Sequence, residues 1–131
     1  MTLALNVLAV AIGGAIGASM RYLVAVLAHG AFGFNFPYGT FVVNVLGSLA
    51  IGYMLVLIPE HPEANPFIRL MLFTGILGGF TTYSAFSVET MQLVHDGQVQ
   101  KALLNIFATL FSCFAAVWAG FHLARLLHGP A

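Results

Sequence analysis

The sequence predicts an all-α integral membrane protein with four transmembrane helices in one domain, residues 1–131, and three observations predict it. Apolar residues make up 60% of the 131 residues, and charged residues only 6%. A soluble domain carries about 25% charged residues, so the four basic and four acidic side chains cannot cover a water-facing surface. Four long apolar segments follow one another, and lipid is the natural solvent for such segments.

Each apolar segment is long enough to cross a hydrocarbon core, which takes about 20 residues. None of them alternates apolar and polar residues, which disfavours membrane strands. The separators at 29–37, 59–66 and 95–101 are rich in Gly, Pro or polar residues, and 59–66 is the most polar loop. We expect transmembrane helices over residues 3–28, 38–58, 67–94 and 102–127.

The first segment is interpreted as a retained helix rather than a signal peptide. A signal peptide begins with basic residues and precedes a polar mature chain, whereas here the first basic residue is Arg21 and the chain stays apolar. An arginine at the centre of a membrane helix costs about 2.5 to 3.5 kcal/mol on insertion scales. Arg21 is nearer an end, so it either reaches the interface or forms a vestibule charge that concentrates anions.

Small residues spaced by four predict close contacts between helices, because lipid-embedded helices associate through close backbone approach. Four helices alone leave little room for a lined pore, so we also expect contacts between subunits and a site that needs at least two copies. The pairs are Gly13 and Gly17, Gly75 and Gly79, and Ala116 and Gly120.

The basic residues do not select one orientation. Positive residues normally accumulate on the cytoplasmic side, but with four spans Arg69 and Arg125 share one side and Lys101 and Arg21 the other. Two explanations remain open: a weak signal overridden by other factors, or insertion in both orientations, which would give an antiparallel dimer. The near-zero net charge suggests no nucleic-acid partner.

The second segment has a polar stripe, Thr40, Asn44 and Ser48, on one helix face. A Ser or Thr hydroxyl can bond its own helix backbone. The Asn44 carboxamide has two donor hydrogens and an acceptor that need partners when buried. Asn44 therefore either makes an interhelical hydrogen bond or donates to a bound or permeating anion.

The third segment is the most informative, with GILGGFTTYSAFSVE at residues 75–89. Gly and hydroxyl residues weaken a helix, and irregular backbone at membrane depth is tolerated only beside protein or a cavity. The pattern predicts either an interrupted, ion-binding helix or a glycine-rich kink that binds nothing. Tyr83 and Phe86 share a face after it, and positive ring edges can face an anion.

The fourth segment places Asn105, Thr109 and Ser112 or Cys113 along one face, which either lines a hydroxyl track or packs closely. The single cysteine excludes an intrachain disulfide. No pair of acidic residues has catalytic spacing and no pair of histidines has ligand spacing, so the sequence does not predict an enzyme.

Three motifs in order make the chain resemble the Fluc (CrcB) family of fluoride channels over nearly its whole length. They are GGAIGASMRY at 13–22, GTFVVNVLGS at 39–48 and GGFTTYSAFSVE at 78–89. The resemblance implies a dual-topology antiparallel homodimer in the bacterial cytoplasmic (inner) membrane, with two passive fluoride pathways that export fluoride. Its third helix would be broken at mid-membrane.

The resemblance also implies roles for individual residues. Asn44 would serve the pathway, and the ring edges of Tyr83 and Phe86 would face fluoride. A structural sodium ion at the dimer centre would be held by backbone carbonyls of Gly78 and Thr81 from both subunits. The other pathway residues implied are Thr40, Ser84, Thr109, Glu89 and the vestibule arginine, Arg21.

Three positions depart from the family pattern. Tyr83 and Ala85 stand where Phe and Thr are usual, and Cys113 stands where a serine is common. Two other functions stay open. A proton-coupled transporter would need a titrating membrane carboxylate, for which Glu89 is the candidate, and a non-transporting packing module would need no ion pathway.

Overall fold

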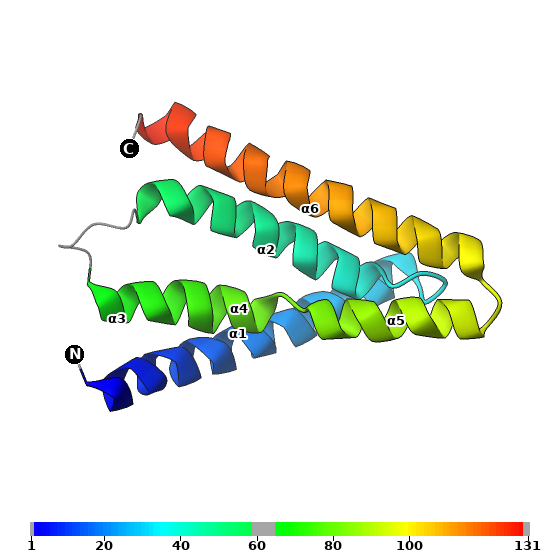
Figure 1. Cartoon of the computed structure of the whole chain (residues 1–131), viewed down its shortest axis with the longest axis horizontal. Helices are drawn as coiled ribbons and strands as arrows, with labels where there is room; N and C mark the ends of the chain where they lie inside the picture. Colours follow the sequence, from blue (N-terminus) through cyan, green and yellow to red (C-terminus); the bar gives the residue numbers. More distant parts are fainter. Residues whose placement is uncertain (1, 59–64, 130–131) are drawn as a thin grey trace.

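The computed structural model describes residues 2–58 and 65–129, which form helical spans running alternately up and down a bundle (Figure 1). Four helices in this part of the chain are long and apolar enough to cross a membrane. This confirms the four predicted spans of a multi-pass membrane protein. Residues 59–64 of the predicted polar loop lie outside the described residues. The spans are Leu3–Phe32, Tyr38–Leu57, Pro66–His95 and Val99–His128.

The first, third and fourth spans run past their predicted ends. Helix α1 (Leu3–Phe32) continues beyond residue 28 to Gly33, whose φ of 81° ends it while its N–H donates to His29 O at 2.8 Å. Gly adopts this left-handed conformation without steric cost. Helix α6 (Val99–His128) begins soon after Gly97, which has a φ of 74°. Polar residues near the ends of these spans stay helical, and glycines determine where the chain turns.

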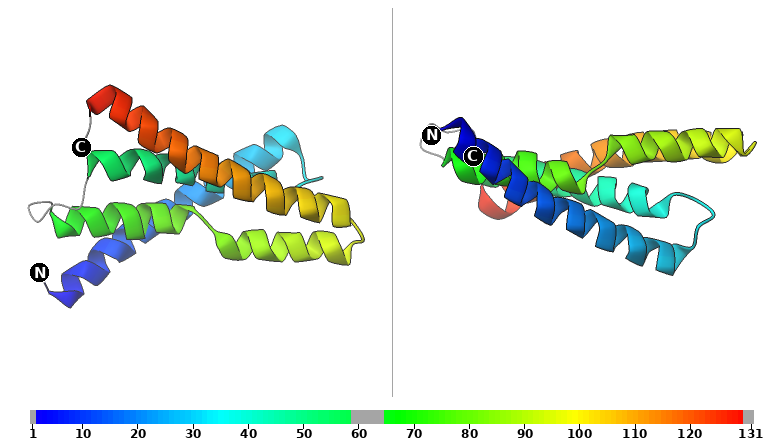
Figure 2. Two further views of the ribbon diagram at one scale, coloured as in Figure 1. Left: turned by 45° about the horizontal axis from the view of Figure 1, so that its top comes forward. Right: turned by 90° about the horizontal axis from the view of Figure 1, so that it is seen from below.

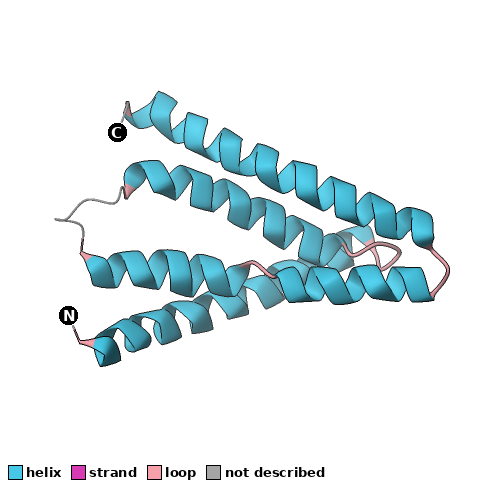
Figure 3. Cartoon of the chain, viewed as in Figure 1, coloured by secondary structure: helices cyan, strands magenta, loops and turns pink. Residues whose placement is uncertain are grey.

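The third span is built from several helical pieces. It comprises α3 (Pro66–Arg69), the π-helix η1 (Leu70–Leu77), α4 (Gly78–Phe80) and α5 (Tyr83–His95). Thr81 and Thr82 lie between α4 and α5 with extended backbone angles, φ −78° and ψ 157° for the first and φ −152° and ψ 118° for the second. This link shows as a loop in Figure 3, and Figure 2 shows α5 offset from the axis of η1 and α4.

The glycine pairs predicted from the sequence mark close backbone approaches within one chain. A Cβ at Gly17 of α1 would meet Ile76 O of η1, and a Cβ at Gly75 would lie 2.8 Å from Gly13 Cα. A Cβ at Gly120 of α6 would meet Leu49 O of α2, the helix that packs along it. These glycines bring α1 against η1 and α6 against α2.

Many large apolar side chains remain exposed on the outside of the bundle. Phe114 and Trp118 of α6 are 71% and 65% exposed, and Leu126 near its end is 82% exposed. Buried side chains are mostly small, such as Ala9, Ala102 and Ala124. An apolar exterior around a core of small residues suits a lipid environment.

Candidate functional site

The carboxamide of Asn44, on α2 (Tyr38–Leu57), is bonded to the backbone of the α4–α5 link. Its Nδ2 donates to Thr82 O at 2.9 Å, and Thr82 N–H donates to Asn44 Oδ1 at 2.8 Å. The two backbone partners determine which way the amide points. Only one of the two Nδ2 hydrogens is used by Thr82. The other has no partner among the described residues, and Asn44 lines the adjacent cavity.

The same arrangement redirects two backbone donors away from helical carbonyls. In an unbroken helix, Thr82 N–H would donate to Gly78 O and Ala85 N–H to Thr81 O. Instead Thr82 N–H goes to Asn44 Oδ1, and Ala85 N–H donates to the Thr82 side-chain Oγ1 at 3.2 Å. The carbonyls of Gly78 and Thr81 therefore lose their helical donors. These are the two residues that the resemblance implied as sodium ligands.

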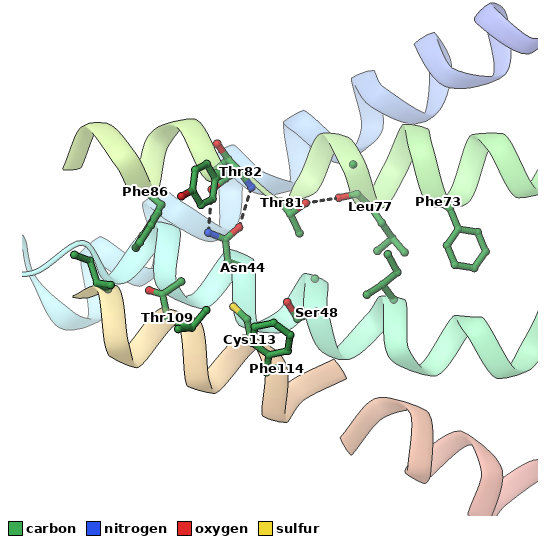
Figure 4. A pocket seen from close by; sticks show the side chains of 16 residues that line it. Asn44, Ser48, Phe73, Leu77, Thr81, Thr82, Phe86, Thr109, Cys113 and Phe114 are labelled. Atoms are coloured by element: carbon green, nitrogen blue, oxygen red, sulfur yellow. Dashed lines mark hydrogen bonds between the residues drawn. The ribbon is translucent and has the colours of Figure 1, made fainter. Parts of the chain in front are cut away.

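A cavity of about 490 Å³ lies beside this link, between α2, the third span and α6. Figure 4 shows Asn44 reaching Thr82 from one side and Thr109, Cys113 and Phe114 presented by α6. Its walls combine a few polar groups with many apolar ones. Six of the predicted site residues line it: Asn44, Gly78, Thr81, Tyr83, Phe86 and Thr109.

The two aromatic residues of α5 form a pair at the wall of the cavity. The ring centroids of Tyr83 and Phe86 lie 5.5 Å apart with an interplanar angle of 47°. Tyr83 is 80% exposed, and in the described part of the chain its hydroxyl has no hydrogen-bond partner. The Tyr83 ring therefore offers its surface to whatever covers this face.

Thr40 and Glu89 lie one helical turn beyond Asn44 and Phe86. Thr40 Oγ1 donates to Glu89 Oε1 at 2.7 Å, while the buried Glu89 Oε2 has no hydrogen-bond partner among the described residues. Glu89 also lines a second, more polar cavity of about 290 Å³, together with His29, Asp96 and Lys101. The Thr40–Glu89 pair thus joins α2 to α5 between the two cavities.

Four predicted site residues do not line the first cavity: Thr40 and Glu89, which form the pair just described, and Ser84 and Arg21. Ser84 is exposed, and its hydroxyl lies 3.2 Å from Thr82 Oγ1, so it acts at the start of α5. Arg21, in the second half of α1, lines neither cavity, and its guanidinium makes no hydrogen bond within the described residues. Arg21 therefore belongs to neither cavity of the single chain.

The sequence patterns did not predict the polar contact between Asn105 on α6 and Thr90 on α5. Asn105 Nδ2 donates to Thr90 Oγ1 at 2.9 Å, and Thr90 Oγ1 donates to Phe86 O at 2.7 Å. Thr90 gives no signal of its own, because a helical threonine commonly bonds a carbonyl of its own helix. The four-residue spacing of Thr90 from Phe86, about one helical turn, predicts only the bond within α5 and not the one from Asn105.

Among the described residues, no group of three or more His, Cys, Asp or Glu side chains could hold a metal ion. The residues that line the first cavity include Asn44, the hydroxyl residues Thr81 and Thr109, and the aromatic residues Tyr83 and Phe86. Four apolar spans, the third interrupted beside a cavity with polar and aromatic walls, define a multi-pass membrane protein.

The comparisons with known proteins identify the family. The profile described as "CrcB-like protein, Camphor Resistance (CrcB)" matches residues 8–121, and the chain belongs to this family. The chain is 44% identical over 123 residues to the "Fluoride-specific ion channel FluC" of Agrobacterium fabrum, which covers 94% of this chain and 98% of that protein.

Two more relatives carry the same name. The protein of Roseiflexus sp. is 43% identical over 123 residues, covering 94% of this chain and 99% of its own. The protein of Legionella pneumophila strain Lens is 42% identical over 118 residues, covering 90% and 88%. The predicted family is therefore confirmed, and these relatives are named as ion channels rather than enzymes.

Proposed function

We propose that this protein is a passive, fluoride-selective channel of the bacterial inner membrane that exports fluoride from the cytoplasm. Relatives that match nearly the whole chain bear that name. The observation that carries the proposal is the remaining Nδ2 hydrogen of Asn44, beside the cavity lined by Tyr83 and Phe86.

Fluoride is small and strongly hydrated, so losing its water is the main barrier to permeation. A conducting site must replace that water with donors and still release the ion. An amide hydrogen and the positive edges of aromatic rings are weak enough for release. Thr40, Ser84, Thr109 and Glu89 extend the pathway with polar groups, and Arg21 concentrates anions at a vestibule.

The working unit is an antiparallel homodimer with two pathways and dual topology, in which the third span is interrupted at mid-membrane. Support comes from the balanced basic residues and from the exposed apolar faces, including Tyr83 at the cavity. A single chain leaves that ring uncovered, and a second copy would cover it while bringing its own link to the same place.

A structural sodium ion at the dimer centre is held by the Gly78 and Thr81 carbonyls of both copies. The residues fit such an ion, because both carbonyls have lost their helical donors to Asn44 Oδ1 and Thr82 Oγ1. Irregular membrane backbone of this kind supplies carbonyl ligands to cations. When bound, such an ion would supply positive charge between the carbonyl oxygens of the two copies.

The test is efflux from liposomes containing the purified protein. A fluoride electrode is expected to record rapid efflux, and a chloride electrode on matched liposomes none. Size-exclusion chromatography with light scattering is expected to report two copies per particle. Folded dimers that release no fluoride would contradict the channel and favour a packing module.

The buried, unpartnered Glu89 Oε2 is the observation that favours proton-coupled transport. Gln at this position keeps an oxygen that accepts a hydrogen bond from Thr40, but its carboxamide does not titrate and so cannot bind and release a proton. We expect fluoride flux through wild type and Glu89→Gln to be equally indifferent to an imposed pH gradient. Uphill fluoride movement in wild type that Glu89→Gln abolishes would favour the transporter.

A further inference from the structure

A buried chain of hydrogen bonds joins two residues of the cavity wall that belong to different helices. Thr109 Oγ1 on α6 donates to Asn105 Oδ1 at 3.4 Å, and Asn105 Nδ2 donates to Thr90 Oγ1 on α5 at 2.9 Å. Thr90 Oγ1 in turn donates to Phe86 O at 2.7 Å. Thr109 and Phe86 both line the cavity, so the chain of bonds runs behind its wall.

The middle of this chain is sealed from the surroundings. Asn105 is 1% exposed and Thr90 is 8% exposed. A hydroxyl has one hydrogen, and that of Thr90 goes to Phe86 O, so Thr90 can only accept from Asn105. Every bond therefore has one direction, and a buried amide of this kind is costly to leave unpaired.

Few side-chain hydrogen bonds connect α5 and the link before it to the neighbouring helices. In the described part of the chain, hydrogen bonds tie the segment from Thr82 to His95 to α2 through Asn44 and Thr40, and to α6 through Asn105. The cavity lies between α2 and α6. Among these hydrogen bonds, the one between Asn105 and Thr90 thus holds α5 beside α6 at the cavity.

We propose that Asn105 is a positioning residue, which acts through Thr90 to hold the first turns of α5, and with them the Phe86 ring, against the α6 wall of the ion pathway. This inference rests on the proposed channel function. Asn105 itself does not line the cavity, so it acts on flux through its hydrogen-bond partners. The shorter bond, to Thr90 at 2.9 Å, leads to Phe86, and the longer one, from Thr109 at 3.4 Å, stays within α6. Thr90→Val leaves the Thr109 bond in place and so tests the route through Phe86 alone.

The experiment compares Asn105→Leu, Thr90→Val and the double variant in the fluoride-efflux assay. At low protein-to-lipid ratio, the fraction of active liposomes reports folded, inserted channels, and the initial rate per active liposome reports the pathway. Ser87→Ala is the matched control, because Ser87 Oγ makes the same bond to a carbonyl four residues back, Tyr83 O at 2.9 Å, on an exposed face. Thr90→Ser keeps the hydroxyl and serves as the rescue.

We expect Asn105→Leu and Thr90→Val each to lower the rate per active liposome by about three- to tenfold, the range that one net hydrogen bond represents. The fraction of active liposomes should stay at the wild-type level. The double variant should be slower than neither single variant by more than about twofold, because both single variants already break the Asn105–Thr90 bond that couples α6 to α5. Thr90→Ser and Ser87→Ala should match wild type.

Wild-type rates in Asn105→Leu, effects that multiply in the double variant, or a loss confined to the fraction of active liposomes would each overturn the proposal. Should Asn105→Leu fail to fold, the comparison of Thr90→Val with Thr90→Ser decides in its place. Absence of flux from wild type and Ser87→Ala alike would contradict the channel function instead.

Discussion

Asn44 on α2 and Thr82 in the α4–α5 link, 38 residues apart, exchange two hydrogen bonds: Nδ2 to Thr82 O at 2.9 Å, and Thr82 N–H to Oδ1 at 2.8 Å. The carboxamide thus replaces the helical acceptor that the Thr82 N–H lacks, and it adds a second donor to the Thr82 carbonyl, which as the N-cap also serves α5. Because it still has one free N–H, the same side chain can support the backbone and face an anion. Structural support and ion contact therefore need not be alternatives at Asn44.

Asn44→Asp is expected to abolish fluoride flux, by at least about a hundredfold. The new carboxylate cannot donate to Thr82 O, sets an oxygen against that carbonyl oxygen, and places negative charge beside the proposed anion pathway. Liposome efflux measures the effect, and size-exclusion chromatography should still show the dimer. Flux within a few-fold of wild type would show that no amide donor is needed.

The matched control is Asn65→Asp. Asn65 Oδ1 accepts from Phe67 N–H at 3.0 Å at the start of α3, and an aspartate caps a helix equally well. The same chemical change should therefore leave flux unaltered there.

Thr82→Val is expected to weaken the dependence of the protein on sodium. Without the hydroxyl, Ala85 N–H loses its cap acceptor, so the start of α5 and the extended link that presents the Thr81 carbonyl become less firmly held. The sodium concentration that gives half of the maximal rise in melting temperature should increase about tenfold. This is roughly the change in sodium affinity expected when one ligand is lost. Melting temperature is measured in sodium against potassium at constant ionic strength, with Thr82→Ser as the variant that retains the cap. Equal sodium dependence in all three proteins would argue against this ion site.

Tyr83→Phe is expected to conduct fluoride within about twofold of wild type. The hydroxyl has no hydrogen-bond partner in the described structure, so its removal leaves nothing unpaired. Tyr83→Ile removes the polarised ring edges and should lower the efflux rate by about tenfold or more. If the Phe variant loses flux as strongly as the Ile variant, the hydroxyl itself contacts the ion.

Gly17→Ala is expected to destabilise the fold. Its Cβ would meet Ile76 O and lie 2.9 Å from Phe80 N, so α1 and the third span must separate, at a cost of about 1–3 kcal/mol. The melting temperature in detergent should fall. Gly30→Ala, on the same helix with no atom within 4 Å of the added Cβ, should be neutral or gain up to about 1 kcal/mol from helix propensity. Equal melting temperatures for the two variants would contradict the close approach.

The four spans could be predicted to within a few residues, because the cost of unpaired backbone in lipid makes long apolar helices a local property of composition. The glycine pairs were also readable as contact positions. The expectation that such contacts join subunits stays a prediction, since the approaches of Gly17 and Gly120 are made inside one chain. Arg21 could not be placed, because snorkelling and vestibule positions have the same sequence pattern.

By itself, the sequence determined the membrane class, the spans and the family, since each depends on composition or on contiguous motifs. Only the tertiary structure decided where the backbone donors near Thr82 go and that Asn105 reaches Phe86 through Thr90. The physical reason is that a hydrogen bond forms with whichever partner lies within reach. For Thr82 and Thr90, that partner comes from another helix, and only packing brings it there.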